Sequence, residues 1–214
     1  MKKVILLLMI CTIGKTSFSQ NGDDHKAEKK KTDMGILLSG GLNMSRIGGD
    51  SESYTGNLPG GYLGAGLSIL KLNKQLGVNV GLGYSMEGSK YEEMQYEPGG
   101  GSSTAKNQVR LNYLRIPVSL RYQSRGGFVG EAGLAPGILL SAKDKANGKK
   151  EDVKDIFNGF DMGIVLGAGY ETKARIGFGL RFVPGLTNIN KSSGPYKAVK
   201  DRNSTISIMA WYKI

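Results

Sequence analysis

Residues 109–142, VRLNYLRIPVSLRYQSRGGFVGEAGLAPGILLSA, predict two long strands joined by one tight turn. In the first arm, apolar residues occupy every second position: Leu114, Ile116, Val118, Leu120 and Tyr122. Residues 124–127 supply the turn, and the second arm alternates again: Phe128, Ala132, Leu134, Ile138 and Leu140. A period of two places alternate side chains on opposite faces of a strand. The stretch therefore predicts a β-hairpin with one apolar face.

The rest of the chain repeats this pattern. Further strand-like runs span 34–47, 61–72, 75–91, 157–171, 174–190 and 203–214. Their connections alternate between long segments, at 48–60, 92–107, 143–156 and 191–202, and tight turns, at 73–74, 124–127 and 172–173. Transmembrane β-barrels have this asymmetry, with short periplasmic turns and long outer loops. The sequence therefore predicts an all-β fold, an eight-stranded antiparallel up-and-down transmembrane β-barrel over residues 34–214.

Glycines indicate which face of the strands points inward. They fill the less apolar face at Gly77, Gly81, Gly83, Gly163, Gly167, Gly169, Gly177 and Gly179. Glycine weakens an exposed strand face, whereas small residues fit inside a narrow barrel. This favours an apolar face turned to lipid over the alternative, a soluble ligand-binding barrel.

Aromatic residues predict two belts at the membrane boundaries. The first comprises Tyr122, Phe128, Tyr170 and Tyr212, and the second Tyr84, Tyr113, Phe160 and Phe182. The belts lie roughly nine residues apart, about the height of an apolar barrel band. Tyr113 is out of phase with Tyr122, so its membership predicts a bulge near Tyr113.

The N-terminus has the features of an export signal. Lys2 and Lys3 precede an apolar run, and Ser17-Phe18-Ser19 forms a small-x-small cleavage site, which predicts a signal peptide over 1–19. Residues 20–33 are polar and predict a flexible periplasmic linker. Cys11 lies within the signal peptide and follows the bulky Ile10, which disfavours a lipoprotein anchor. The mature chain would then contain no cysteine for disulfides, catalysis or metal binding.

The basic charge bears on the partners. The formal net charge is +11, and loss of three lysines with the signal peptide would lower it to +8. Export argues against nucleic acid, and the lysines cluster in linkers and loops. The expected contacts are outer-membrane lipid and anionic lipopolysaccharide, with an envelope protein as a further partner.

Charged residues on the inward face predict a cluster in the lumen. An arginine on the lipid face would cost up to about 2 to 4 kcal/mol near the midplane. By the same alternation the predicted lumen set is Glu87, Arg115, Arg121, Glu131, Asp161, Glu171 and Arg181. These charges predict either an ion path or a salt-bridged plug, and the plug is favoured because eight strands are filled by their own side chains.

Several of these segments resemble one family. The signal peptide, the glycine-rich run LLSGGLNMS, the segment Tyr113-Leu114-Arg115-Ile116-Pro117, the run from Arg181 to Ile189 and the closing aromatic strand are similar to PorT-like outer-membrane β-barrel proteins. The resemblance implies a small, porin-like barrel in the outer membrane, and its namesake implies a link to type IX secretion and gliding. The chain departs from common barrels in ending on Ile214 rather than Phe or Tyr.

Three function classes follow from these features. Enzymes of small barrels use a Ser-His arrangement, but His25, the single histidine, lies in the predicted linker, so we expect no enzyme activity, cofactor or metal site. The remaining classes are a narrow passive pore and a structural, interaction or assembly barrel acting through its outer loops. The second is favoured, with an outer-membrane location.

Overall fold

The computed structural model describes residues 33–50, 54–70, 72–73, 75–96, 102–146, 148–191 and 200–214. Their elements in chain order are β1 (Asp33–Gly49), β2 (Tyr54–Leu70), β3 (Leu76–Tyr96), β4 (Ser102–Arg115), β5 (Val118–Gln123), β6 (Phe128–Ala146), β7 (Lys149–Asp152), the 3-10 turn η1 (Lys154–Ile156), β8 (Phe160–Glu171), β9 (Ile176–Pro184) and β10 (Asp201–Lys213). No helix within these ranges is long and apolar enough to cross a membrane.

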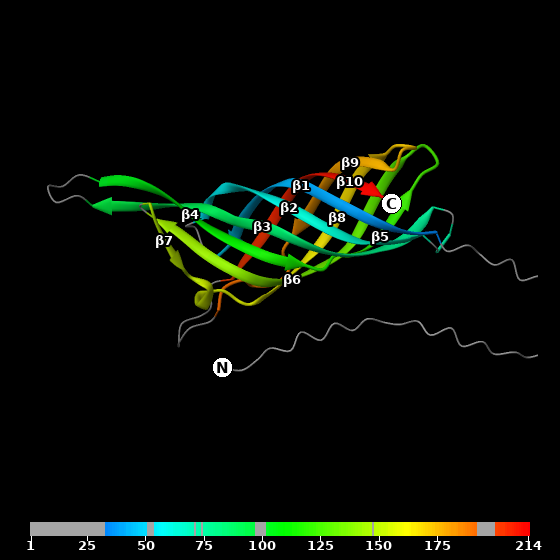
Figure 1. Ribbon diagram of the computed structural model, residues 1–214. Helices are drawn as coiled ribbons and strands as arrows, with labels where there is room; N and C mark the ends of the chain where they lie inside the picture. Colours follow the sequence, from blue (N-terminus) through cyan, green and yellow to red (C-terminus); the bar gives the residue numbers. More distant parts are fainter. Residues whose placement is uncertain are drawn as a thin grey trace, which may run out of the picture. The chain divides into compact units, whose positions relative to one another are not determined.

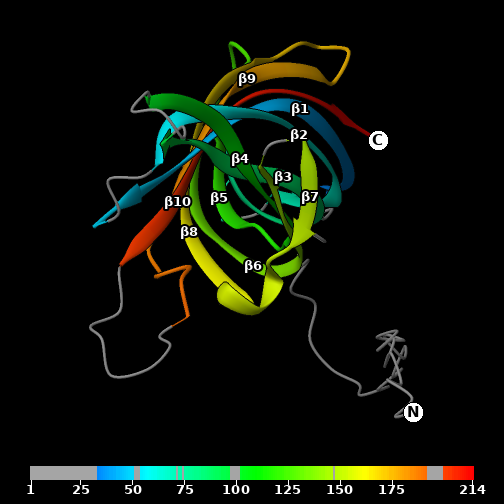
Figure 2. The same ribbon diagram turned by 90° about the vertical axis from the view of Figure 1, so that its left-hand side faces the viewer.

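The strands close into a ring. Neighbouring strands of the ring pair antiparallel, and β1 pairs with both β2 and β10, which closes the ring. Strands β4 and β5 form one barrel position, broken at Ile116 and Pro117, because both pair with β3 and with β6. Pro117 lacks an N–H group, but its carbonyl accepts from the Gly81 N–H at 2.9 Å. With β7 added only to β6, the barrel has eight positions, and the predicted fold class is confirmed (Figures 1 and 2).

Alternation separates an apolar exterior from a polar interior. Outward side chains such as Leu42 and Leu63 are each 72% exposed. Inward side chains of the same strands, such as Asn43 and Ser45, are buried. A surface this apolar must face another apolar phase. The predicted direction of the faces is therefore correct.

The connections between strands are short at one end of the barrel and long at the other. The tight turns lie at the end that also carries the C-terminus, where Ile214 exchanges backbone hydrogen bonds with Ile36. At the other end the β3–β4 and β6–β7 hairpins project well beyond the ring (Figure 1). By the general rule for such barrels, the short turns are periplasmic and the hairpins lie outside.

Three of the predicted long loops are wrong over much of their length. Segment 92–107 is mostly a hairpin, since β3 continues to Tyr96 and β4 begins at Ser102. In segment 143–156, β6 continues to Ala146 and pairs with β7. Segment 48–60 contains the start of β2 at Tyr54. These extensions carry isolated apolar residues, such as the buried Leu58, but no apolar alternation to mark them, while backbone pairing still forms the ladder.

The observed bounds of the first strand and of the last two strands also differ from the predicted ones. Run 174–190 ends as a strand at Pro184, after which the backbone turns irregularly inward. Strand β10 begins at Asp201, and residues 192–199 of the last loop lie outside the described residues. Strand β1 begins at Asp33, while the predicted signal peptide 1–19 and residues 20–32 of the predicted linker 20–33 lie outside the described part.

Tyr113 does not belong to the outer aromatic belt. It is fully buried in the lumen, because Tyr113 and Arg115 share the inward face of β4 without interruption. The register shift beside it lies in β6, where Asn112 pairs with Ser141 and Tyr113 with Leu139, so Leu140 is the extra residue. The remaining belt residues point outward and are exposed: Tyr84, Tyr122, Phe128, Phe160, Tyr170, Phe182 and Tyr212.

Candidate functional site

The predicted charge cluster lies in the lumen as three groups of ion pairs. The turn-side cluster contains Arg121 and Glu171, whose Nη2 and Oε2 atoms are 2.6 Å apart. Gln123 Nε2 donates to Glu171 Oε1 at 2.9 Å, and Trp211 Nε1 donates to Oε2 at 2.8 Å. The Arg121 guanidinium lies over the Trp211 ring, 5.0 Å from its centroid. The Arg121 guanidinium and the Glu171 carboxylate therefore each have more than one partner in the lumen.

The middle cluster likewise joins an arginine, a glutamate and an aromatic ring. Arg181 Nη2 lies 2.9 Å from Glu131 Oε2, and Ser119 Oγ donates to the other carboxylate oxygen at 2.5 Å. The Arg181 guanidinium lies over the Tyr62 ring at 5.7 Å. Arg121 is the direct cross-strand partner of Glu131, so this carboxylate links the two clusters.

The outer cluster is built around Arg115. Its guanidinium pairs with Glu87 Oε2 at 2.5 Å and with Asp161 Oδ2 at 2.7 Å. Asn203 Nδ2 donates to Glu87, and Thr187 Oγ1 donates to Asp161 Oδ1 at 2.7 Å. The ring of Tyr113 lies 4.4 Å from the Arg115 guanidinium carbon.

All seven predicted residues thus lie in the lumen and pair with one another. Sequence reasoning missed the aromatic residue in each cluster, namely Tyr62, Tyr113 and Trp211. Three arginines face four carboxylates, and each arginine binds both a carboxylate and an aromatic face. Each of the seven charged groups therefore has an opposite charge as a direct partner.

The inward glycines make room for the aromatic rings. A Cβ atom on Gly177 would lie 2.1 Å from Trp211, and one on Gly83 would lie 2.5 Å from the Tyr62 hydroxyl. A Cβ on Gly169 would also meet Trp211, at 2.6 Å. Glycines opposite an inward aromatic residue are therefore the signal that would have placed Trp211 and Tyr62 in the lumen.

An apolar plug closes the outer end of the lumen. It is a cluster of buried side chains contributed by three strands, β1, β4 and β6, and by two irregular segments: Ile47, Val109, Leu111, Tyr113, Leu139, Ala142, Phe157 and Ile189. Asn158 Nδ2 holds the two irregular segments together by donating to the carbonyls of Asn188 and Asn190, at 2.9 Å each. A dry constriction of this kind opposes the passage of ions.

Little free volume remains between these layers. Cavities among the charged clusters measure about 30, 20 and 20 Å³. A water molecule needs roughly 10–15 Å³ of such space, so each cavity has room for only one or two waters. The lumen is therefore packed rather than open.

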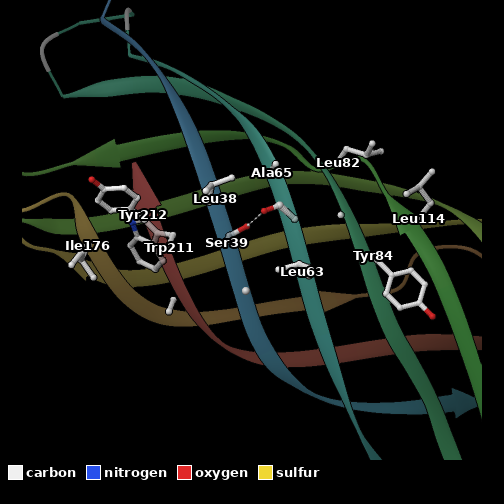
Figure 3. A pocket seen from close by; sticks show the side chains of 14 residues that line it. Leu38, Ser39, Leu63, Ala65, Leu82, Tyr84, Leu114, Ile176, Trp211 and Tyr212 are labelled. Carbon is white, nitrogen blue, oxygen red and sulfur yellow. Dashed lines mark hydrogen bonds between the residues drawn. The ribbon is translucent and has the colours of Figure 1, made fainter. Parts of the chain in front are cut away.

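The outward surface carries an apolar hollow of about 810 Å³ across β10, β1, β2 and β3. Figure 3 shows Leu38, Leu63, Ala65, Leu82 and Tyr84 among its lining residues. Small residues at Gly40, Ala65 and Ala210 lower the surface between the larger side chains. A hydrocarbon chain fits such a surface, and a polar ligand does not.

Beyond the outer aromatic belt, the exterior becomes basic. A basic patch of Lys90, Arg110, Lys143 and Lys145 covers the outward face of β3, β4 and β6. Arg110 and Lys143 are direct cross-strand partners, and Gln108 pairs with both Lys90 and Lys145. Like charges directly opposite each other destabilise a sheet, and Asp152 of β7, the partner of Lys143 on its other side, offsets part of this repulsion.

Comparison with known proteins agrees with this architecture. Residues 18–191 match the family model described as "Outer membrane protein beta-barrel domain", so the chain belongs to that family. It is an outer-membrane β-barrel protein in contact with membrane lipid, as predicted. No curated protein sequence matches the chain.

Solved structures are similar to the chain at low sequence identity. Neisserial surface protein A is 10% identical over 84% of this chain and 97% of its own, with a TM-score of 0.51. The attachment invasion locus protein Ail of Yersinia pestis is 15% identical over 84% of this chain and 98% of its own, with a TM-score of 0.46. OprG of Pseudomonas aeruginosa is 12% identical over 85% of this chain and 95% of its own, with a TM-score of 0.38.

Proposed function

We propose that this protein is a closed structural or interaction barrel of the outer membrane, which acts through its projecting outer hairpins rather than through its lumen. The packing of the lumen carries this proposal. Three salt-bridged clusters and an apolar plug fill the interior, while β3 and β4 extend outward beyond it. The proposed role is non-enzymatic, because the residues that the structure describes include no histidine to serve as a general base.

Lipopolysaccharide is the first proposed partner. The basic patch lies just outside the apolar exterior, at the height where the phosphates of an outer-leaflet glycolipid would lie. On the outward face of β3, exposed Leu82 and Tyr84 give way to exposed Lys90 six residues further along. A phosphate between Arg110 and Lys143 would accept hydrogen bonds from both and would offset the part of their repulsion that Asp152, opposite Lys143, leaves uncompensated.

Binding of purified lipopolysaccharide to the detergent-solubilised protein tests this partner. The double variant Arg110→Gln/Lys143→Gln should bind about tenfold more weakly, since about 1.4 kcal/mol corresponds to a factor of ten. Lys173→Gln, an exposed site at the periplasmic turns, is the control and should bind like the wild type. Equal affinity of the double variant and the wild type would exclude the patch.

An envelope protein partner is the second proposal. The β3–β4 hairpin offers backbone and side chains well outside the membrane, where another protein can reach them (Figure 1). A link to PorT-like proteins and type IX secretion rests on the sequence resemblance alone. Capture of the intact protein from solubilised outer membranes, with and without the hairpin, tests whether a partner binds there.

A further inference from the structure

A second pocket opens at the outer end of the barrel, above the apolar plug. Its volume is about 370 Å³, at the lower end of the range of small-molecule sites. Val109 and Phe157 form its floor, and Tyr54 and Tyr91 contribute aromatic surface. A transmembrane strand needs about 9–11 residues, whereas β3 has 21, so Tyr91 lies beyond the spanning part of β3.

The aromatic wall is ordered by a carboxylate. The Tyr54 and Tyr91 rings meet edge to face, with centroids 6.2 Å apart and planes at 83°. The Tyr91 hydroxyl donates to Asp144 Oδ2 at 2.8 Å. The second oxygen, Asp144 Oδ1, is buried and has no hydrogen-bond partner among the described residues. A buried carboxylate oxygen of this kind is an acceptor without a donor.

The pocket is acidic in a basic protein. Glu92, Glu93 and Asp144 line it, and its lining includes neither lysine nor arginine, although the chain has a formal net charge of +11. Asn107 Nδ2 donates to Glu93 at 3.2 Å and neutralises no charge. Burial, the hydrogen bond to Asp144 and the nearby carboxylates raise the pKa of Tyr91 well above its usual range.

These features point to a ligand with both a cationic and an apolar part. No three carboxylates or other metal-ligating groups converge on a metal position among the described residues, which argues against a bare metal ion. An ammonium group can donate to Asp144 Oδ1 and lie against the tyrosine rings at the same time. The apolar floor then covers the carbon body of the ligand.

We propose that the pocket bounded by Tyr54, Tyr91, Glu93 and Asp144 binds an organic cation, a primary ammonium group on an aliphatic or aromatic body. The inference rests on the proposed function, because it requires the hairpins to face the outside. The outer end would then recognise an organic cation in addition to the anionic lipid proposed for the exterior.

Calorimetry of the full-length protein with 2-phenylethylamine, and with its neutral analogue 2-phenylethanol, tests this site. The protein is kept in octyl glucoside, since detergents with choline or amine-oxide heads would compete. We expect the amine to bind at least tenfold more tightly than the alcohol, and Asp144→Asn to abolish that preference. Asp152→Asn, on exposed β7 and outside the pocket lining, is the matched control and should retain it.

Three results would overturn the proposal: equal binding of amine and alcohol, unchanged preference in Asp144→Asn, or no amine binding by a correctly folded barrel. Folding of each variant is checked by the mobility difference between unboiled and boiled gel samples. Lipopolysaccharide binding is measured on the same variants. Asp144→Asn leaves the basic patch intact, so loss of amine binding with retained lipopolysaccharide binding separates the two proposals.

Discussion

At the scale of single residues, the lumen depends on arginine rather than on positive charge alone. Arg115 binds Glu87 through two nitrogens, contacts Asp161 and lies over the Tyr113 ring. A planar guanidinium can make all of these contacts at once, whereas a lysine ammonium cannot. The burial of these charges is therefore offset by contacts that only one geometry provides.

Replacement of Arg115 by methionine should impair the barrel. Glu87 and Asp161 would remain buried without a counter-charge, and breaking a buried pair in this way costs about 3–5 kcal/mol. We expect the gel band of the folded barrel to disappear at a lower heating temperature than in the wild type. Arg125→Met, in an exposed turn, is the control and should leave that temperature unchanged. Equal stability of the two variants would contradict a structural role for the outer cluster.

Gly177→Ala should disturb the seat of Trp211. The added Cβ would lie 2.1 Å from the indole, and overpacking typically costs about 1–3 kcal/mol. Trp211 is the single tryptophan, so its fluorescence emission reports its environment directly. We expect a shifted emission maximum and lower thermal stability. Gly159→Ala, where the Cβ would meet nothing within 4 Å, should show neither change.

At the scale of elements, the sequence predicted the membrane-spanning part well and the outer part poorly. Across β3, the alternation of Val80, Leu82 and Tyr84 with glycines marks a strand because lipid and lumen impose opposite demands. Beyond Lys90 water surrounds the hairpin, and that contrast disappears. The belt spacing predicts the wrong face for Tyr113, whereas its unbroken alternation with Arg115 predicts the lumen.

Shortening the β3–β4 hairpin should leave the barrel intact. Glu92 and Lys106 are direct cross-strand partners, so an Asn-Gly turn between them can close the ladder. The membrane-spanning parts of β3 and β4, on the barrel side of the Glu92–Lys106 pair, keep their pairing. We expect the folded gel band to persist at wild-type temperature. Loss of that band would mean that the projecting hairpin is needed for assembly.

At the scale of the whole molecule, the barrel separates its surfaces by charge. The exterior is apolar over the membrane and basic above it, and the outer pocket is acidic. The lumen holds paired charges below an apolar plug. Anionic lipid outside and an organic cation inside the outer rim can thus bind without competing. Under the proposed function, recognition takes place at the outer end and the lumen supports the barrel.

The purified wild-type protein should give no steady, porin-sized current in planar bilayers. Single variants should not open it either: Phe157→Ala loosens the plug but leaves three salt-bridged clusters, and Arg121→Ala leaves the plug. Only the combined variant is expected to leak ions, since it weakens both closures. A known porin in the same bilayers serves as the positive control. A large single-channel current from the wild type, unchanged by these substitutions, would contradict the closed lumen and favour the passive pore.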